Sequence, residues 1–146
     1  MQNVFLDKEL VFGVMSGRAS TAINRKIYRS FYTNNIPLTP EQWMVLQYLS
    51  LKDGISQREL AEIAFRDKTG ITRMLDILER NGLIARLSDK SDKRRNRIYL
   101  TKAGQGIHQN AKQFVYEAML TAVDGLTEEE VRIGEKILRR VFDNLE

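Results

Sequence analysis

The chain of 146 residues contains no cysteine and one histidine, His108. The absence of thiols excludes disulfides, zinc–thiolate sites and thiol-based redox sensing. A single histidine argues against a histidine-rich metal site, and we expect neither a metal nor a cofactor. Long apolar runs are also missing, since no stretch approaches the ~18 residues of a membrane span. The opening MQNVFLDKEL lacks the layout of a signal peptide. We therefore expect a cytoplasmic protein with no membrane partner.

Sequence motifs of common enzyme classes are absent too. No GxSxG, HExxH or GxxxxGK[ST] pattern occurs, and Gly104-Gln105-Gly106 is too short for a phosphate-binding loop. The acidic residues are scattered along predicted helix surfaces and do not form a cluster. We expect that the protein is not an enzyme.

What the chain does contain is an ordinary globular composition, 42% hydrophobic and 29% charged. Its length predicts one domain, residues 1–146. Apolar periodicity predicts a long helix over residues 5–33 and five further helices. Their starts are marked by the capping residues Thr39 with Gln42, Ser56 with Glu59, Asp67, Thr101, and Thr127 with Glu130. Residues 83–87 and 97–100 alternate like strands around a polar loop. The predicted fold is mainly α-helical with one small β-hairpin.

The third and fourth predicted helices form a helix-turn-helix pattern. In the fourth, about residues 68–81, Ile71, Leu75 and Leu78 recur at i, i+4 and i+7 and should face the core. The opposite side and its flanks would present Lys68, Thr69, Thr72 and Arg73. A helix of this kind fits the major groove of DNA, where Arg and Lys donate to guanine and a threonine methyl contacts thymine.

The hairpin that follows carries concentrated positive charge. Between Arg86 and Arg97, six cationic side chains stand against two aspartates, a net charge of +4, which equals that of the whole chain. Such a footprint favours a polyanion. The candidate contacts in the hairpin are Lys93, Arg94, Arg95 and Arg97. Its narrow tip can reach a minor groove, while Ser56 and Gln57 at a helix start can donate to phosphate. We expect binding to double-stranded DNA.

Two features of the sequence argue against DNA contacts. Taken singly, each cationic residue is more often a solvated surface charge than a DNA contact. Asp76 and Glu79 would also repel phosphate from the fourth helix. The order of helix pair, turn and charged hairpin is what favours DNA.

Several segments resemble the multiple antibiotic resistance regulator (MarR) family, and the resemblance spans nearly the whole chain. The segments are Leu38-Thr39-Pro40-Glu41-Gln42-Trp43, Glu59-Leu60-Ala61, Thr72-Arg73-Met74-Leu75-Asp76, residues 78–86 (LERNGLIAR), Ser91-Asp92-Lys93-Arg94-Arg95, Ile98-Tyr99-Leu100-Thr101, and Gly104. The resemblance implies a homodimeric winged helix-turn-helix regulator, residues 36–101, flanked by dimerisation helices, residues 1–35 and 102–146. Such regulators usually bind pseudo-palindromic operators, often repress, and often respond to small aromatic or anionic ligands.

By position in the family pattern, Asp92 would orient the wing by pairing with a nearby arginine, and Arg94 would enter the minor groove. One branch of the family senses oxidants through a cysteine of the N-terminal helix, which this chain lacks. Metal-sensing branches need several histidine or acidic ligands together.

The terminal helices carry more apolar surface than the central unit can cover. Phe5, Leu6 and Leu10, and at the other end Val141, Phe142 and Leu145, would be exposed in a monomer, which favours a two-fold dimer. The alternative is that they close the monomer core. A dimer would place its recognition helices roughly 34 Å apart, one turn of DNA.

A small-molecule effector is the least specific of these expectations. Arg18 could pair with an anionic ligand, and Met15, Trp43 and Tyr48 could form apolar and aromatic walls. Ordinary packing is the more frequent explanation of each, and Trp43 in particular sits where a core anchor belongs. Two other functions stay open, a sequence-neutral architectural DNA binder and a winged-helix protein-interaction module.

Overall fold

The computed structural model describes residues 7–64 and 68–146, without the side chains of Lys68 and Thr69. Phe5, Leu6 and the predicted cap Asp67 lie outside the described residues. The elements are α1 (Lys8–Thr33), α2 (Pro40–Leu51), β1 (Ile55–Ser56), α3 (Gln57–Ile63), α4 (Lys68–Arg80), β2 (Ile84–Ser88), β3 (Asn96–Leu100), α5 (Lys102–Ala122) and α6 (Glu128–Leu145). The predicted order of helices around one hairpin is confirmed.

The predicted capping residues explain where most helices begin. Both halves of a capping box are present for α2, at Thr39 and Gln42, and for α6, at Thr127 and Glu130. The box predicted for α3 is only half formed. Ser56 Oγ accepts from the backbone N–H of Glu59, but the Glu59 carboxylate pairs with Lys52 Nζ at 3.1 Å.

The sheet has three antiparallel strands in the order β1-β3-β2, and sequence analysis missed β1. This strand pairs Ile55 with Ile98 and Ser56 with Arg97. Two residues are too few to show the alternation that reveals a strand in sequence. The extra strand matters because it joins the start of α3 to the hairpin.

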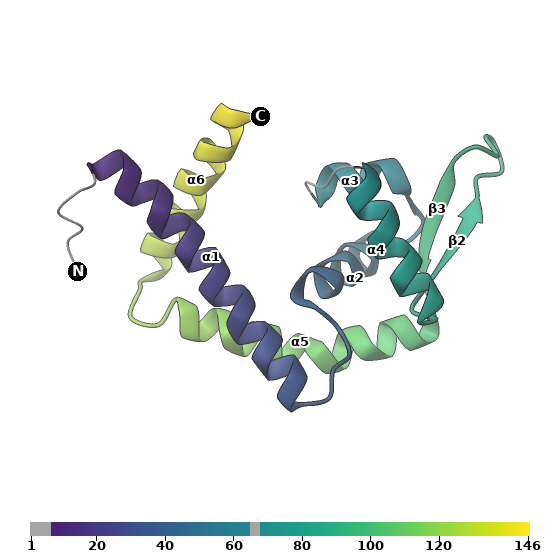
Figure 1. Cartoon of the computed structure of the whole chain (residues 1–146), viewed down its shortest axis with the longest axis horizontal. Helices are drawn as coiled ribbons and strands as arrows, with labels where there is room; N and C mark the ends of the chain where they lie inside the picture. Colours follow the sequence, from purple (N-terminus) through teal and green to yellow (C-terminus); the bar gives the residue numbers. More distant parts are fainter. Residues whose placement is uncertain (1–6, 65–67) are drawn as a thin grey trace.

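The winged unit and the terminal helices lie at opposite ends of α5 (Figure 1). The central unit packs apolar side chains of α2, α3, α4 and the sheet against α5, whose buried residues extend from Gly104 to Ala118, and against the second half of α1. The amino-terminal half of α1 and the whole of α6 extend away from that core (Figure 1), and α6 contains no buried residue. None of the helices in the described residues has the length and apolarity to cross a membrane.

A buried stack of two rings joins α2 to α5. The rings of Trp43 and His108 lie 5.3 Å apart at 13°. Trp43 Nε1 donates to the His108 carbonyl at 3.2 Å, and His108 Nε2 lies 2.6 Å from Gln47 Oε1. Burial, and then the charge of Lys112, lowers the pKa of His108 below its ordinary value, so the ring is neutral at neutral pH. Trp43 is therefore a core anchor.

The start of α5 packs tightly against the chain that leads into β2. Thr101 Oγ1 donates to the Gly82 carbonyl at 2.6 Å and accepts from the Gly104 N–H at 3.0 Å. A Cβ placed on Gly104 would lie 2.0 Å from the Leu83 carbonyl oxygen. Only glycine fits there, because backbone atoms cannot move aside as a flexible side chain can.

We predict that Gly104→Ala lowers the free energy of unfolding by about 1–3 kcal/mol, the usual effect of overpacking. Gly106→Ala in the same helix is the matched control, because a Cβ there meets nothing within 4 Å. The control should raise stability by about 0.5–1 kcal/mol, since alanine favours a helix over glycine. Urea denaturation measures both, and equal effects of the two substitutions would contradict the packing argument.

Candidate nucleic-acid interface

Helix α4 presents one face to the core and one to solvent, as predicted. Ile71, Leu75 and Leu78 are fully buried, and this fixes the rotation of the helix. Arg73 and Arg80 are exposed on the other side. The described part of the outer face is therefore cationic at two positions.

The residues predicted to read DNA differ in their solvent exposure and in their hydrogen bonds within the protein. Gln57 Nε2 at the start of α3 donates to Thr72 Oγ1 at 2.7 Å, and both side chains are partly buried. This bond ties α3 to α4. The side chains of Lys68 and Thr69 lie outside the described residues. Of the four positions predicted on α4, Arg73 is thus the one that the described residues show to be exposed.

The carboxylates of α4 are paired, which corrects the expectation that they face phosphate unneutralised. Arg86 of β2 reaches both: its Nη2 lies 2.5 Å from Asp76 Oδ1 and 2.9 Å from Glu79 Oε1. The hydrogen bond from Arg86 holds the pKa of Glu79 below its ordinary value. Arg86 is one of the six cationic residues counted in the hairpin, but its charge is paired with carboxylates of the protein itself.

Asp89 anchors the wing, and sequence analysis missed this role. Its carboxylate, with a side chain only 10% exposed, lies 2.9 Å from Arg97 Nε on β3. It also accepts from the N–H and hydroxyl of Ser91 at 2.9 and 2.8 Å. Arg97 Nη1 in turn donates to the Gly54 carbonyl at 2.9 Å. The chain of bonds links the hairpin to the turn before β1.

Two residues with predicted roles, Arg97 and Asp92, form contacts within the protein. Arg97 was expected to contact DNA, but its guanidinium already serves Asp89 and Gly54. Asp92 was expected to orient the wing, yet its contacts stay within the loop. It accepts from the Arg94 N–H at 3.0 Å and lies 3.6 Å from Arg94 Nε and 3.7 Å from Arg95 Nε. Asp92 therefore shapes the tip, and Asp89 fastens it. Sequence gave no signal to choose between the two aspartates.

The wing tip presents its cations to solvent. Lys93, Arg94 and Arg95 are all exposed, and the Arg94 side chain is 94% exposed. The ion pairs of Arg94 and Arg95 with Asp92 are exposed to water and are therefore weak. These side chains are consequently available to an external anion.

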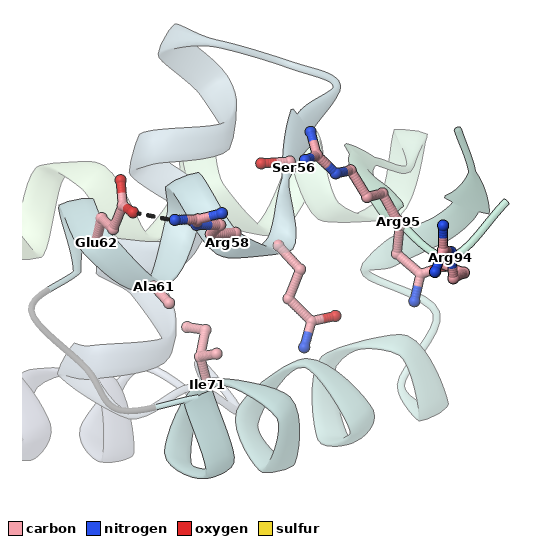
Figure 2. A pocket seen from close by; sticks show the side chains of 9 residues that line it. Ser56, Arg58, Ala61, Glu62, Ile71, Arg94 and Arg95 are labelled. Atoms are coloured by element: carbon pink, nitrogen blue, oxygen red, sulfur yellow. Dashed lines mark ion pairs between the residues drawn. The ribbon is translucent and has the colours of Figure 1, made fainter. Parts of the chain in front are cut away.

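A groove of about 610 Å³ separates the wing tip from α3 and α4. Figure 2 shows Arg94 and Arg95 on the wing side, Ile71 on α4, and the ion pair of Arg58 with Glu62 on α3. Ser56 and Gln57 also line it. The groove thus combines cations with hydroxyl and amide donors, the groups that position a phosphate backbone.

The candidate ligand residues do not form a site in the described structure. Trp43 is only 3% exposed and bonded to α5, as a core anchor is, and a ligand role for it stays a prediction. Tyr48 packs against the core, whereas Met15 and Arg18 are exposed on α1. In residues 7–64 and 68–146, no group of three His, Asp or Glu side chains could hold a metal ion.

Comparisons with known proteins agree with this geometry. The sequence pattern of the MarR family matches residues 38–95. TtmR of Methylorubrum extorquens, described as an HTH-type transcriptional regulator, is 35% identical over 102 residues, which cover 70% of this chain and 50% of that protein. The chain therefore matches about half the length of that relative.

Solved structures match over nearly the whole chain. A mutant MarR from E. coli, complexed with operator DNA, matches with a TM-score of 0.83 at 26% sequence identity. The match covers 96% of this chain and 99% of that chain. The PcaV transcriptional regulator from Streptomyces coelicolor, in complex with its natural ligand, has a TM-score of 0.83 at 25% identity, covering 97% and 98%. The fold is thus a winged helix with flanking helices.

The Asp89 network predicts how stability depends on pH. Its hydrogen bonds, first with the Ser91 N–H and hydroxyl and then with Arg97, lower the pKa of Asp89 from 3.8 to about 2. A carboxylate whose pKa is lower in the folded than in the unfolded state stabilises the fold at pH values above its unfolded-state pKa. This stabilisation is lost as the pH falls through the folded-state pKa.

We therefore predict that Asp89→Asn destabilises the protein at neutral pH and makes its stability fall less steeply between these two pKa values. Urea denaturation at a series of pH values measures both effects. Asp124→Asn, in the exposed loop before α6, is the control that removes a carboxylate outside this network. If the stability of Asp89→Asn fell as steeply as that of the parent between pH 3.8 and about 2, the assignment of Asp89 as the anchor of the wing would be contradicted.

Proposed function

The chain belongs to the MarR family, and we propose that it is a sequence-specific DNA-binding transcription regulator acting as a homodimer. The observation that carries the proposal is the exposed cationic wing tip, fastened to the body by Asp89 and Arg97. Exposed arginines on a fixed hairpin suit a minor groove, whose negative potential attracts them. A DNA partner also fits the expected cytoplasmic location.

The outer face of α4 would enter the adjacent major groove. We propose Lys68, Thr69, Thr72 and Arg73 as its base-reading residues, with Arg94 in the minor groove and Lys93 and Arg95 on phosphates. Ser56 and Gln57 would meet the backbone at the groove between α3 and the wing. Arg97 and Asp92 support the wing without direct contact. The E. coli MarR structure with operator DNA, at TM-score 0.83, supports this placement.

Apolar surface left open by the fold supports a dimer. Exposed large side chains gather on the amino-terminal half of α1 and on α6, namely Leu10, Phe12, Val14, Met15, Val131, Ile133, Ile137, Leu138, Phe142 and Leu145. Because α6 has no buried residue, these side chains do not close the monomer core. A second copy would cover them. We propose that the amino-terminal half of α1 and α6 dimerise, while α5 and the second half of α1 contribute to the core of the winged unit.

Regulation by a ligand is a further part of the proposal. PcaV is described with its natural ligand, and a small aromatic or anionic effector would suit the same arrangement. Arg18 and Met15 on α1 are the exposed candidates. Such a ligand can release DNA only by binding the bound and free conformations unequally. Repression is the action we propose for the DNA-bound dimer, and we propose no catalytic activity.

Footprinting on selected genomic fragments, with sedimentation analysis of the same protein, tests the function. We expect a dimer that protects one pseudo-palindromic site whose halves are one DNA turn apart. Even coating of many sequences would instead indicate an architectural protein. A lone subunit that protects no fragment would indicate a protein-interaction module.

Arg94→Ala tests the wing. We predict weaker binding to every duplex and a salt slope of log K smaller by about 1, because one phosphate-rich contact is lost. Fluorescence anisotropy at several salt concentrations measures the slope. Arg132→Ala on α6 is the control, since it removes an exposed arginine far from the wing. An unchanged slope in Arg94→Ala would exclude the groove contact.

A further inference from the structure

The pairing of Arg86 with α4 is more extensive than a surface ion pair. Besides its two guanidinium contacts at 2.5 and 2.9 Å, the Arg86 backbone N–H lies 3.3 Å from Glu79 Oε2. The Arg86 side chain is 17% exposed, whereas those of Asp76 and Glu79 are 47% and 41% exposed. The arginine is thus covered by protein, and the two carboxylates stand at the solvent boundary.

The position of the two carboxylates makes their charge important for DNA. Asp76 lies one turn after Thr72, and Glu79 lies one turn after Leu75, on the helix that we propose enters the major groove. Phosphates approaching α4 would meet a charge of −2 without Arg86. Charge-assisted hydrogen bonds hold Arg86 at both groups, and the bond with Glu79, more than the bond with Asp76, raises the pKa of Arg86. The local charge is therefore −1, and it is fixed in place.

We infer that Arg86 is a positioning residue for DNA binding, which offsets one of the two negative charges that Asp76 and Glu79 place on α4. This inference rests on the proposed function. Arg86 itself does not touch DNA in this scheme. Its role is to keep two acidic groups, which α4 uses to hold β2, from repelling the phosphate backbone.

The experiment compares duplex binding by four proteins. These are the parent, Arg86→Gln, Asp76→Asn/Glu79→Gln, and the triple variant that combines all three substitutions. Fluorescence anisotropy with a labelled duplex of the best-bound genomic sequence, at several salt concentrations, gives the affinities. Arg139→Gln is the matched control, because Arg139 is also paired with a carboxylate, Glu135, but on α6.

Arg86→Gln should weaken binding about tenfold at low salt, and the triple variant should recover to within about threefold of the parent. The recovery should shrink as salt rises, because screening removes repulsion between exposed charges. A purely structural role predicts no recovery, since the amides do not restore the ion pairs. A triple variant as weak as Arg86→Gln, or an Arg86→Gln variant as tight as the parent, would overturn the inference.

The double variant keeps the test decisive if Arg86→Gln does not fold. Asp76→Asn/Glu79→Gln leaves the Arg86 charge unneutralised beside α4, so it should bind the duplex more tightly than the parent. Equal or weaker binding would overturn the inference. A parent protein that binds no duplex would instead contradict the proposed function, which separates the two failures.

Discussion

The bond network around Asp89 is the constraint on which the DNA-binding surface depends. A two-stranded hairpin alone is marginally stable in water, and this one carries a cluster of like charges at its tip. Asp89 and Arg97 join the hairpin to the Gly54 carbonyl, and β1 adds a third strand at the same place. The tip can therefore carry repelling cations because its base is held by hydrogen bonds and strand pairing.

The charges of the wing divide into two groups with different tasks. Arg86 forms an ion pair with Asp76 of α4, and Arg97 forms an ion pair with Asp89. Lys93, Arg94 and Arg95 remain exposed at the tip. A count of charge along the sequence adds both groups together. In the folded protein, the internal pairs hold the reading elements in place, and the exposed side chains are left for an external polyanion.

Sequence predicted most elements of the fold because their signals are local. Thr39, Thr101 and Thr127 mark helix starts by bonds to residues three positions away, and the period of Ile71, Leu75 and Leu78 sets the inner face of α4. What sequence could not supply were contacts between distant segments. The pairing of β1 with β3, the choice of Asp89 over Asp92, and the stacking of Trp43 on His108 of α5 all depend on how elements meet in space.

The ring stack between α2 and α5 has a practical consequence. Trp43 is the sole tryptophan of the chain, and it stacks on His108, which joins α2 of the winged unit to α5. Indole emission from this protein consequently originates at one known joint. A shift of α5 relative to α2 alters the distance between indole and imidazole. Ultraviolet-excited fluorescence can thus follow such a rearrangement in the unlabelled molecule.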